Sequence, residues 1–214
     1  MTSLRFDDER GYADFATFVR RARTADPDGA MRLQAVGVTL AAHVQVLPGR
    51  GLLAEGAVLG LRASALAEPV DLDVVVPLTA LTDRLARHPE GVELPVPPTV
   101  VSAPWASLGA PRSGWEPVGE VPEDDLREVA TAGIEEVAVG SRTADGAAAG
   151  GAPALAALRQ AVWSRLTRTT PPVPAGAAFG AHVLGFLAPG GTARVLSAGR
   201  WVRLTASSGH VLVR

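Results

Sequence analysis

The chain contains no cysteine and no lysine among its 214 residues. The absence of cysteine excludes disulfide bonds, a thiolate nucleophile, and zinc or iron–sulfur sites bound through thiolates. Because lysine is also absent, arginine supplies all 20 of the Lys+Arg side chains. Arginine is well suited to bidentate anion recognition. Its use at every basic position nevertheless fits a GC-rich genome better, as do the many alanine, glycine and proline residues.

Long hydrophobic runs and an excess of positive charge are also missing. No apolar run is long enough to span a bilayer, and residues 1–10 are polar, unlike a signal peptide. We therefore expect a cytoplasmic protein that does not enter a membrane. The net charge of −2 disfavours a strongly basic nucleic-acid binder, because such a protein needs positive charge to neutralise phosphates.

Sequence motifs for several familiar chemistries are absent as well. The four histidines, at positions 43, 88, 182 and 210, do not occur at metal-ligand spacing. The glycine-rich turns lie beside strands rather than before helices, so they do not form a phosphate-binding loop. There is no Gly-x-Ser-x-Gly motif for a hydrolase nucleophile. The sequence therefore predicts no catalytic residue, no cofactor and no metal site.

One acidic pair has a spacing that could serve a divalent cation. Asp71 and Asp73 lie two residues apart on one face of a predicted strand, as in some paired-carboxylate and magnesium sites. Apolar residues occupy the alternate positions of the same segment: Val70, Leu72, Val74 and Val76. We therefore interpret the two carboxylates as the polar outer face of that strand.

The clearest positive pattern runs from residue 36 to residue 46. Apolar residues occupy every even position: Val36, Val38, Leu40, Ala42, Val44 and Val46. The odd positions include Thr39, His43 and Gln45. This alternation predicts a strand with one buried face and one face in water. Residues 48–51 predict a turn, and residues 52–61 and 70–76 are predicted to be two further strands of an antiparallel sheet.

Apolar residues at helical spacing, with proline or glycine at the boundaries, predict five helices. They cover residues 12–24, 77–88, 123–140, 153–168 and 174–187. The acidic residues Glu123, Asp124 and Asp125 favour the first turn of the third helix through the helix dipole. Residues 144–151, rich in glycine and alanine, are predicted to form a loop. Three short strands at 193–197, 201–205 and 210–213 are predicted to close the chain as a meander.

A proline-rich stretch separates the two halves of the chain. We predict an α+β fold, with antiparallel sheets and covering amphipathic helices in two halves joined by a Pro/Trp-rich crossover. The segments are residues 1–94, the crossover at 95–121, and residues 122–214; whether the halves pack as one domain stays open. Trp105 and Trp115 indicate an ordered crossover, because disordered linkers seldom carry large aromatic side chains. We interpret both tryptophans as anchors on the domain surface; the alternative is that they line a ligand groove.

Four short segments carry a resemblance to known proteins. Residues 14–18, 173–174, 184–187 and 198–202 resemble an uncharacterised family of actinobacterial proteins, over most of the chain. That family has no assigned activity, so the resemblance implies no catalytic residue. A Val-Pro start, a helix, a glycine stop and three strands also resemble, more remotely, one repeat of a bacterial DNA polymerase sliding clamp. The chain departs from the clamp pattern because the proline-rich stretch follows Gly91 where strands are expected, and because it is too short for a clamp subunit.

These patterns favour a non-catalytic binding, scaffold or assembly module. The candidate surface is the outward strand face with Thr39, His43 and Gln45, on which His43 is expected to be solvated. The expected partner is an unknown protein or a second copy, paired through an edge strand. The alternative is an enzyme or small-ligand binder with a pocket between the halves, near Trp105, Trp115 and His43. A clamp-like DNA-associated protein is a third hypothesis, which predicts an arginine-lined concave surface and a ring-shaped oligomer.

Overall fold

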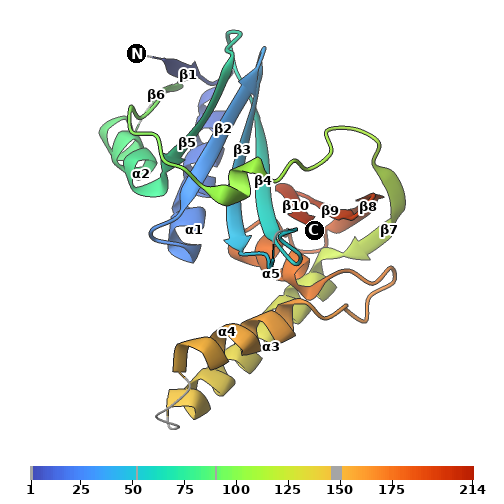
Figure 1. The fold of residues 1–214 in the computed structure, drawn as a ribbon. Coiled ribbons are helices and arrows are strands. Elements are labelled where there is room, and N and C mark those ends of the chain that lie inside the picture. The colour runs from blue at the N-terminus through green and yellow to red at the C-terminus, as the bar shows by residue number, and fades with distance from the viewer. Residues whose placement is uncertain (1, 52, 90, 146–150) are drawn as a thin grey trace.

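The computed structural model of the chain describes residues 2–51, 53–89, 91–145 and 151–214. Within these ranges, helices and antiparallel strands build an α+β fold, which confirms the predicted class (Figure 1). The strands are β1 (Ser3–Arg5), β2 (Ala30–Val36), β3 (Thr39–Leu47), β4 (Val58–Ala65), β5 (Leu72–Pro77), β6 (Glu93–Pro95), β7 (Glu116–Pro122), β8 (Thr192–Ala198), β9 (Trp201–Ala206) and β10 (Gly209–Val213). The helices are α1 (Glu9–Ala25), α2 (Leu78–Arg87), α3 (Glu123–Asp145), α4 (Gly151–Trp163) and α5 (Ala175–Val183), with a 3₁₀ turn η1 (Pro104–Ser107).

Eight of the described strands form one continuous antiparallel sheet. Their order is β5-β2-β3-β4-β10-β9-β8-β7, and β1 pairs with β6 in a separate two-stranded sheet. The two halves of the chain, each predicted to carry its own sheet, meet edge to edge where β4 pairs with β10. In that pairing Leu59 lies opposite Leu212. The sheet therefore has two faces that extend across both halves of the chain.

The alternation over residues 36–46 spans a hairpin rather than a single strand. Residue Gly37, with φ of +59°, turns the chain between β2 and β3. On β3 the even positions from residue 40 to residue 44 are buried as predicted, but on β2 the buried positions are odd. The two-residue turn at 37–38 switches the buried positions from odd on β2 to even on β3. Val36 and Val38 lie at this hairpin and are 62% and 51% exposed. The prediction that both are buried is wrong.

The return strand begins later than predicted. β4 starts at Val58, whereas a strand over residues 52–61 was expected, and residue 52 itself lies outside the described ranges. Arg50 and Glu55 exchange backbone hydrogen bonds of 2.9 Å, which closes a tight turn between them. Gly51 and Ala54 in this turn have positive φ values of 64° and 50°. Residues 53–55, which the apolar pattern had assigned to the strand, belong to this turn instead.

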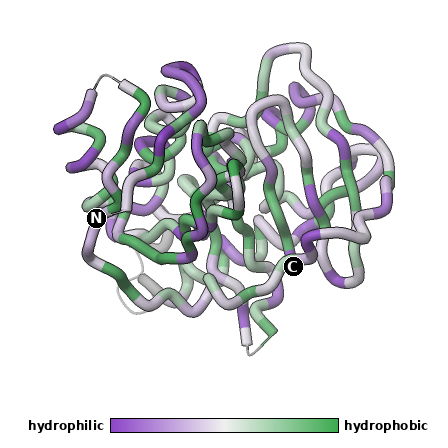
Figure 2. Tube along the Cα trace, turned by 90° about the horizontal axis from the view of Figure 1, so that it is seen from above, coloured by the Kyte–Doolittle hydropathy of each residue, from purple (hydrophilic) through white to green (hydrophobic). Residues whose placement is uncertain are grey.

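The main hydrophobic core lies between the helices and one face of the sheet. The first predicted helix is confirmed as α1, capped by Asp8, whose side chain accepts a 2.6 Å hydrogen bond from the Gly11 amide. The apolar residues at helical spacing in this segment are all buried: Tyr12, Phe15, Phe18, Val19 and Ala22. The apolar residues at helical spacing in α2 are buried too: Leu78, Leu81 and Leu85. In Figure 2 hydrophobic segments run through the middle of the trace, and many hydrophilic ones lie at its periphery.

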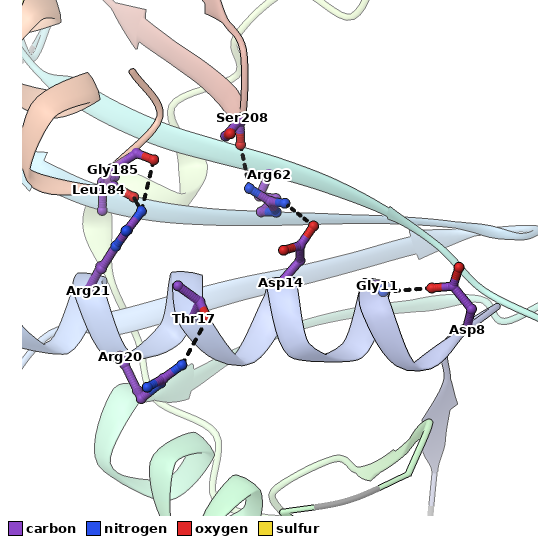
Figure 3. Close-up of polar contacts among 10 residues, drawn as sticks. All are labelled: Asp8, Gly11, Asp14, Thr17, Arg20, Arg21, Arg62, Leu184, Gly185 and Ser208. Atoms are coloured by element: carbon purple, nitrogen blue, oxygen red, sulfur yellow. Dashed lines mark hydrogen bonds and ion pairs between the residues drawn. The ribbon is translucent and has the colours of Figure 1, made fainter. Parts of the chain in front are cut away.

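Helix α1 also ties the two halves together on this side of the sheet (Figure 3). Arg62 of β4 donates to the backbone oxygen of Ser208 and forms an ion pair of 2.8 Å with Asp14 of α1. Arg21 of α1 donates to the backbone oxygen of Gly185 at 2.8 Å. The buried core cluster accordingly includes residues of both halves.

The helices of the second half differ from their predicted limits. α3 and α4 lie side by side and project away from the sheet (Figure 1). α4 ends at Trp163 rather than residue 168, and Leu166, an apolar residue within the predicted helix, is 65% exposed. α5 ends at Val183 rather than residue 187, because Gly185 adopts a positive φ of 66° and stops the helix early. Of the predicted loop at 144–151, residues 146–150 lie outside the described ranges.

The predicted C-terminal meander is confirmed as β8, β9 and β10. Leu204 of β9 is fully buried on the helix side, while Trp201 and Arg203 point to the opposite face. Within the described ranges, the structure contains no helix with the length and apolar character needed to cross a membrane.

Candidate functional site

The face of the sheet opposite the helices is crossed by residues 103–115, which we call the strap. Trp105 anchors the strap, because it is only 9% exposed and packs with Leu59, Trp201 and Leu212 in a second, smaller hydrophobic cluster. This packing agrees with the anchoring interpretation of that tryptophan. Arg32 of β2 fixes the strap to the sheet, because it donates a 2.8 Å hydrogen bond to the Ala106 backbone oxygen.

A cavity of about 500 Å³ lies between the strap and the sheet; we call it the strap cavity. Its walls come from β2, β3, β4, β9 and β10 and from the strap itself, so both halves of the chain contribute. Residues 106–111 of the strap have short side chains or are glycine and proline, apart from Leu108, and they do not fill the space above the strands. The apolar part of the lining includes Leu59, Leu61 and Leu212. The volume is in the range of small-molecule sites.

Four of the five predicted site residues line this cavity: Thr39, His43, Trp105 and Trp115. The fifth, Gln45, lies farther along β3 and lines a separate groove that also contacts Trp105. β3 therefore presents its odd positions to the strap side, as the alternation predicted. The role of these residues in binding stays a prediction.

His43 is covered rather than solvated, which corrects the expectation of a wet strand face. Burial lowers the pKa of His43 to about 4, with a further lowering by the nearby positive charge of Arg32. The imidazole is therefore neutral at physiological pH. Its Nδ1 atom is buried and has no hydrogen-bond partner in the structure. Sequence periodicity placed this side chain on the correct face, but the cover comes from a segment more than 60 residues away.

Arg203 of β9 lies across the cavity from β3. Its guanidinium carbon is 4.8 Å from the centroid of the Trp115 ring, a cation–π contact. Trp115 is fixed in turn, because its indole nitrogen donates a 2.9 Å hydrogen bond to the Pro111 backbone oxygen. Burial, and then the charge of Arg194, lower the pKa of Arg203. The Nε atom of Arg203 is buried without a hydrogen-bond partner.

Arg32, at the opposite side of the cavity, is already paired. Its Nε and Nη2 atoms donate to the two carboxylate oxygens of Asp73 at 2.7 and 2.6 Å, and Gln34 donates to the same carboxylate at 3.0 Å. These hydrogen bonds raise the pKa of Arg32 and lower that of Asp73. Asp73 thus pairs with Arg32 on the strap side of the sheet, which agrees with its interpretation as a charge on the polar face of that strand. Asp71 precedes β5 and is exposed. Among the described residues, no group of three or more potential ligands could hold a metal ion.

Sequence reasoning missed the arginines of the cavity: Arg32, Arg112 and Arg203. Arg32 was missed because β2 was not recognised as a strand. The single glycine at position 37 was the signal that could have revealed the hairpin. Arg203 lies two residues after Trp201 on β9, so strand alternation alone places the two side chains on one face. Nothing local in the sequence, however, indicates that Arg112 and Trp115 come to lie over that face.

Comparison with known families gives two adjoining matches. Residues 1–107 match the family described as "Domain of unknown function (DUF8010)", and residues 110–214 match "Domain of unknown function (DUF8185)". No curated protein matches the chain. The two matches meet within the strap, so the strap cavity is lined by residues of both. Since the first match spans half of the chain, the protein belongs to the uncharacterised DUF8010 family, and its second half is similar to DUF8185.

Proposed function

We propose that the protein is a binding module that holds a small molecule in the strap cavity. The observation that supports this most strongly is the enclosed space of about 500 Å³ between the strap and the sheet, which both halves of the chain line. Its lining combines an apolar floor with a few polar side chains, among them His43 and Arg203. A concave, mostly apolar site with a small number of polar groups is the usual form of a small-molecule site.

The lining supports binding better than catalysis. The neutral imidazole of His43 has no hydrogen bond to a nucleophile among the described residues. The hydroxyl of Ser107 is occupied, because it donates a 2.7 Å hydrogen bond to the Pro104 backbone oxygen. Fixed polar groups around an apolar floor are what a binding site needs to orient a ligand.

Filling the cavity tests this proposal. Ala41 of β3 lines the cavity, and Ala63 lies directly opposite it on β4, is exposed and does not line the cavity. Ligand-observed NMR with a small-molecule library of mixed charge should give hits for the native protein. We expect Ala41→Phe to lose these hits and the matched variant Ala63→Phe to keep them. A library without hits, or hits that survive Ala41→Phe, would contradict the proposal.

Other partners stay hypotheses. Self-association through an edge strand receives little support from the two edges: β7 carries Pro117 and Pro122, and the Val101 amide donates to the Val75 backbone oxygen of β5. Light scattering would test self-association and would also test the ring-shaped oligomer of the clamp-like hypothesis. An actinobacterial origin and a cytoplasmic location are likewise expectations from sequence.

A further inference from the structure

We infer that the ligand of the strap cavity is a small organic anion, whose carboxylate or phosphate group is held by Arg203 and whose apolar body lies on the leucine floor. This inference rests on the proposed function and adds the chemical class of the ligand to it. It is drawn from the charges and the apolar lining of the cavity.

The charges of the lining are all positive. The described lining residues include three arginines, Arg32, Arg112 and Arg203, and no aspartate or glutamate. The carboxylate of Asp73 neutralises Arg32 through its two hydrogen bonds. Arg203 and Arg112 form no ion pair among the described residues, although Arg112 lies near enough to Asp73 to lower the pKa of that carboxylate. The protein as a whole carries a net charge of −2, so this positive pocket is a local feature of the strap side.

The guanidinium of Arg203 is pre-positioned for an anion. The Trp115 ring lies 4.8 Å from its central carbon and restricts its position. A guanidinium offers a planar fork of donors that matches carboxylate or phosphate oxygens. An ordered guanidinium loses less conformational freedom when it binds. A neutral ligand would leave the positive charge of Arg203 without a counter-charge, and a cation would be repelled.

The remaining polar group suits an acidic ligand as well. His43 is neutral at physiological pH, because burial lowers its pKa to about 4, so it carries no charge that would oppose an acidic ligand. Between the two polar positions, Leu59, Leu61 and Leu212 offer an apolar floor. An acid with an aromatic ring or short hydrocarbon body matches this combination and the cavity volume of about 500 Å³.

Four probes with one ring system test the inference: naphthoate, naphthyl phosphate, neutral naphthol and the naphthylmethylammonium cation. We would measure their affinities by calorimetry and by quenching of tryptophan fluorescence, at neutral pH and low salt. At least one of the two anions should bind about tenfold or more tightly than naphthol, since charge-assisted hydrogen bonds contribute this much. Arg203→Gln should remove that advantage and leave the affinity for naphthol unchanged.

A matched control comes from the turn between β8 and β9. Arg200 there is exposed and does not line the cavity, so Arg200→Gln should leave all four affinities unchanged. Should Arg203→Gln fail to fold, Arg112→Gln replaces it, because Arg112 is exposed on the strap and its loss should weaken anion binding about threefold or more.

The outcomes separate this inference from the proposed function. If naphthol or the cation binds as tightly as the anions, and Ala41→Phe abolishes that binding, the cavity is a ligand site but the anion inference is overturned. Anion binding that persists unchanged in Arg203→Gln would overturn it too. If no probe and no library compound binds in a manner sensitive to Ala41→Phe, the proposed function itself fails.

Discussion

The two faces of the eight-stranded sheet are covered in different ways. Helices α1, α2 and α5 pack onto one face and bury an apolar core that includes the largest fully enclosed side chains of the described chain. The strap covers the other face with one buried tryptophan and a run of short side chains, and it leaves a cavity above the strands. One face is therefore packed to exclude solvent, and the other keeps room for a ligand.

The two faces also differ in how fully their buried polar groups are hydrogen-bonded. At the start of α3, on the helix side, Glu123 is fully buried, and its carboxylate accepts hydrogen bonds from the Ala188 amide and from the amide and hydroxyl of Ser207. On the strap side, His43 and Arg203 each keep an atom without a partner. The paired group contributes to stability, whereas a buried polar atom without a partner reduces it.

The largest expected effect is the loss of a core aromatic residue on the helix face. Phe15→Ala removes a fully buried ring that lies 5.2 Å from the ring of Phe6, and it should destabilise the fold by about 3–5 kcal/mol. Leu61→Ala, on the strap side, removes a half-buried side chain beside the existing cavity and should cost only about 1 kcal/mol. Urea unfolding measures both. Equal losses would show that the two faces contribute alike to stability.

Buried polar groups give the next comparison. Glu123→Ala leaves the Ala188 and Ser207 amides without their charged acceptor and should cost about 3 kcal/mol. Arg203→Met removes an unpaired group, and its stability should stay within about 1 kcal/mol of the native protein. Chemical denaturation of both variants tests the contrast. A larger loss for Arg203→Met than for Glu123→Ala would contradict it.

A pH dependence follows from His43. Its pKa of about 4 in the folded protein lies below the ordinary value of 6.5, so the unfolded chain binds the proton first as the pH falls. Above about pH 6.5, His43 does not change the free energy of unfolding. By about pH 5, its protonation in the unfolded chain should lower the free energy of unfolding by about 2 kcal/mol.

The control for this prediction is His43→Gln, in which that part of the pH dependence is absent. His210, whose pKa is also lowered by burial, contributes to both proteins and cancels in the comparison. Unfolding free energies measured at about pH 7 and about pH 5 should therefore differ less for the variant. Identical pH dependences for the two proteins would show that His43 is not buried as the structure describes.

The smallest effect is expected at two glycines on which an added methyl group meets no atom. Gly37→Ala places a side chain at φ of +59° in the hairpin between β2 and β3, and should cost about 1 kcal/mol. Gly109→Ala, in the strap, has open space and no positive φ, so it should be neutral or slightly stabilising. Thermal unfolding distinguishes them. A clear loss of stability for Gly109→Ala would show that the strap depends on the special conformational freedom of glycine.

Periodic patterns predicted the parts of the fold that depend on local spacing. The inward residues of α1 and α2, the three strands of the meander and the outward side of β3 all follow from repeats of 3.6 or 2 residues. The errors fall where one residue ends an element. Gly37 reverses the alternation at a hairpin, and Gly185 stops α5 before the apolar pattern ends.

The sequence by itself determined the class of the fold and the side to which most strand and helix residues point, because both are properties of the local backbone. Only the tertiary structure decided that the two halves share one sheet and that the strap lies over His43 rather than solvent. It also brought Arg203 of the second half into the same cavity as β3 of the first. Contacts between residues this far apart in the chain depend on packing that no local repeat encodes, and the candidate site consists of such contacts.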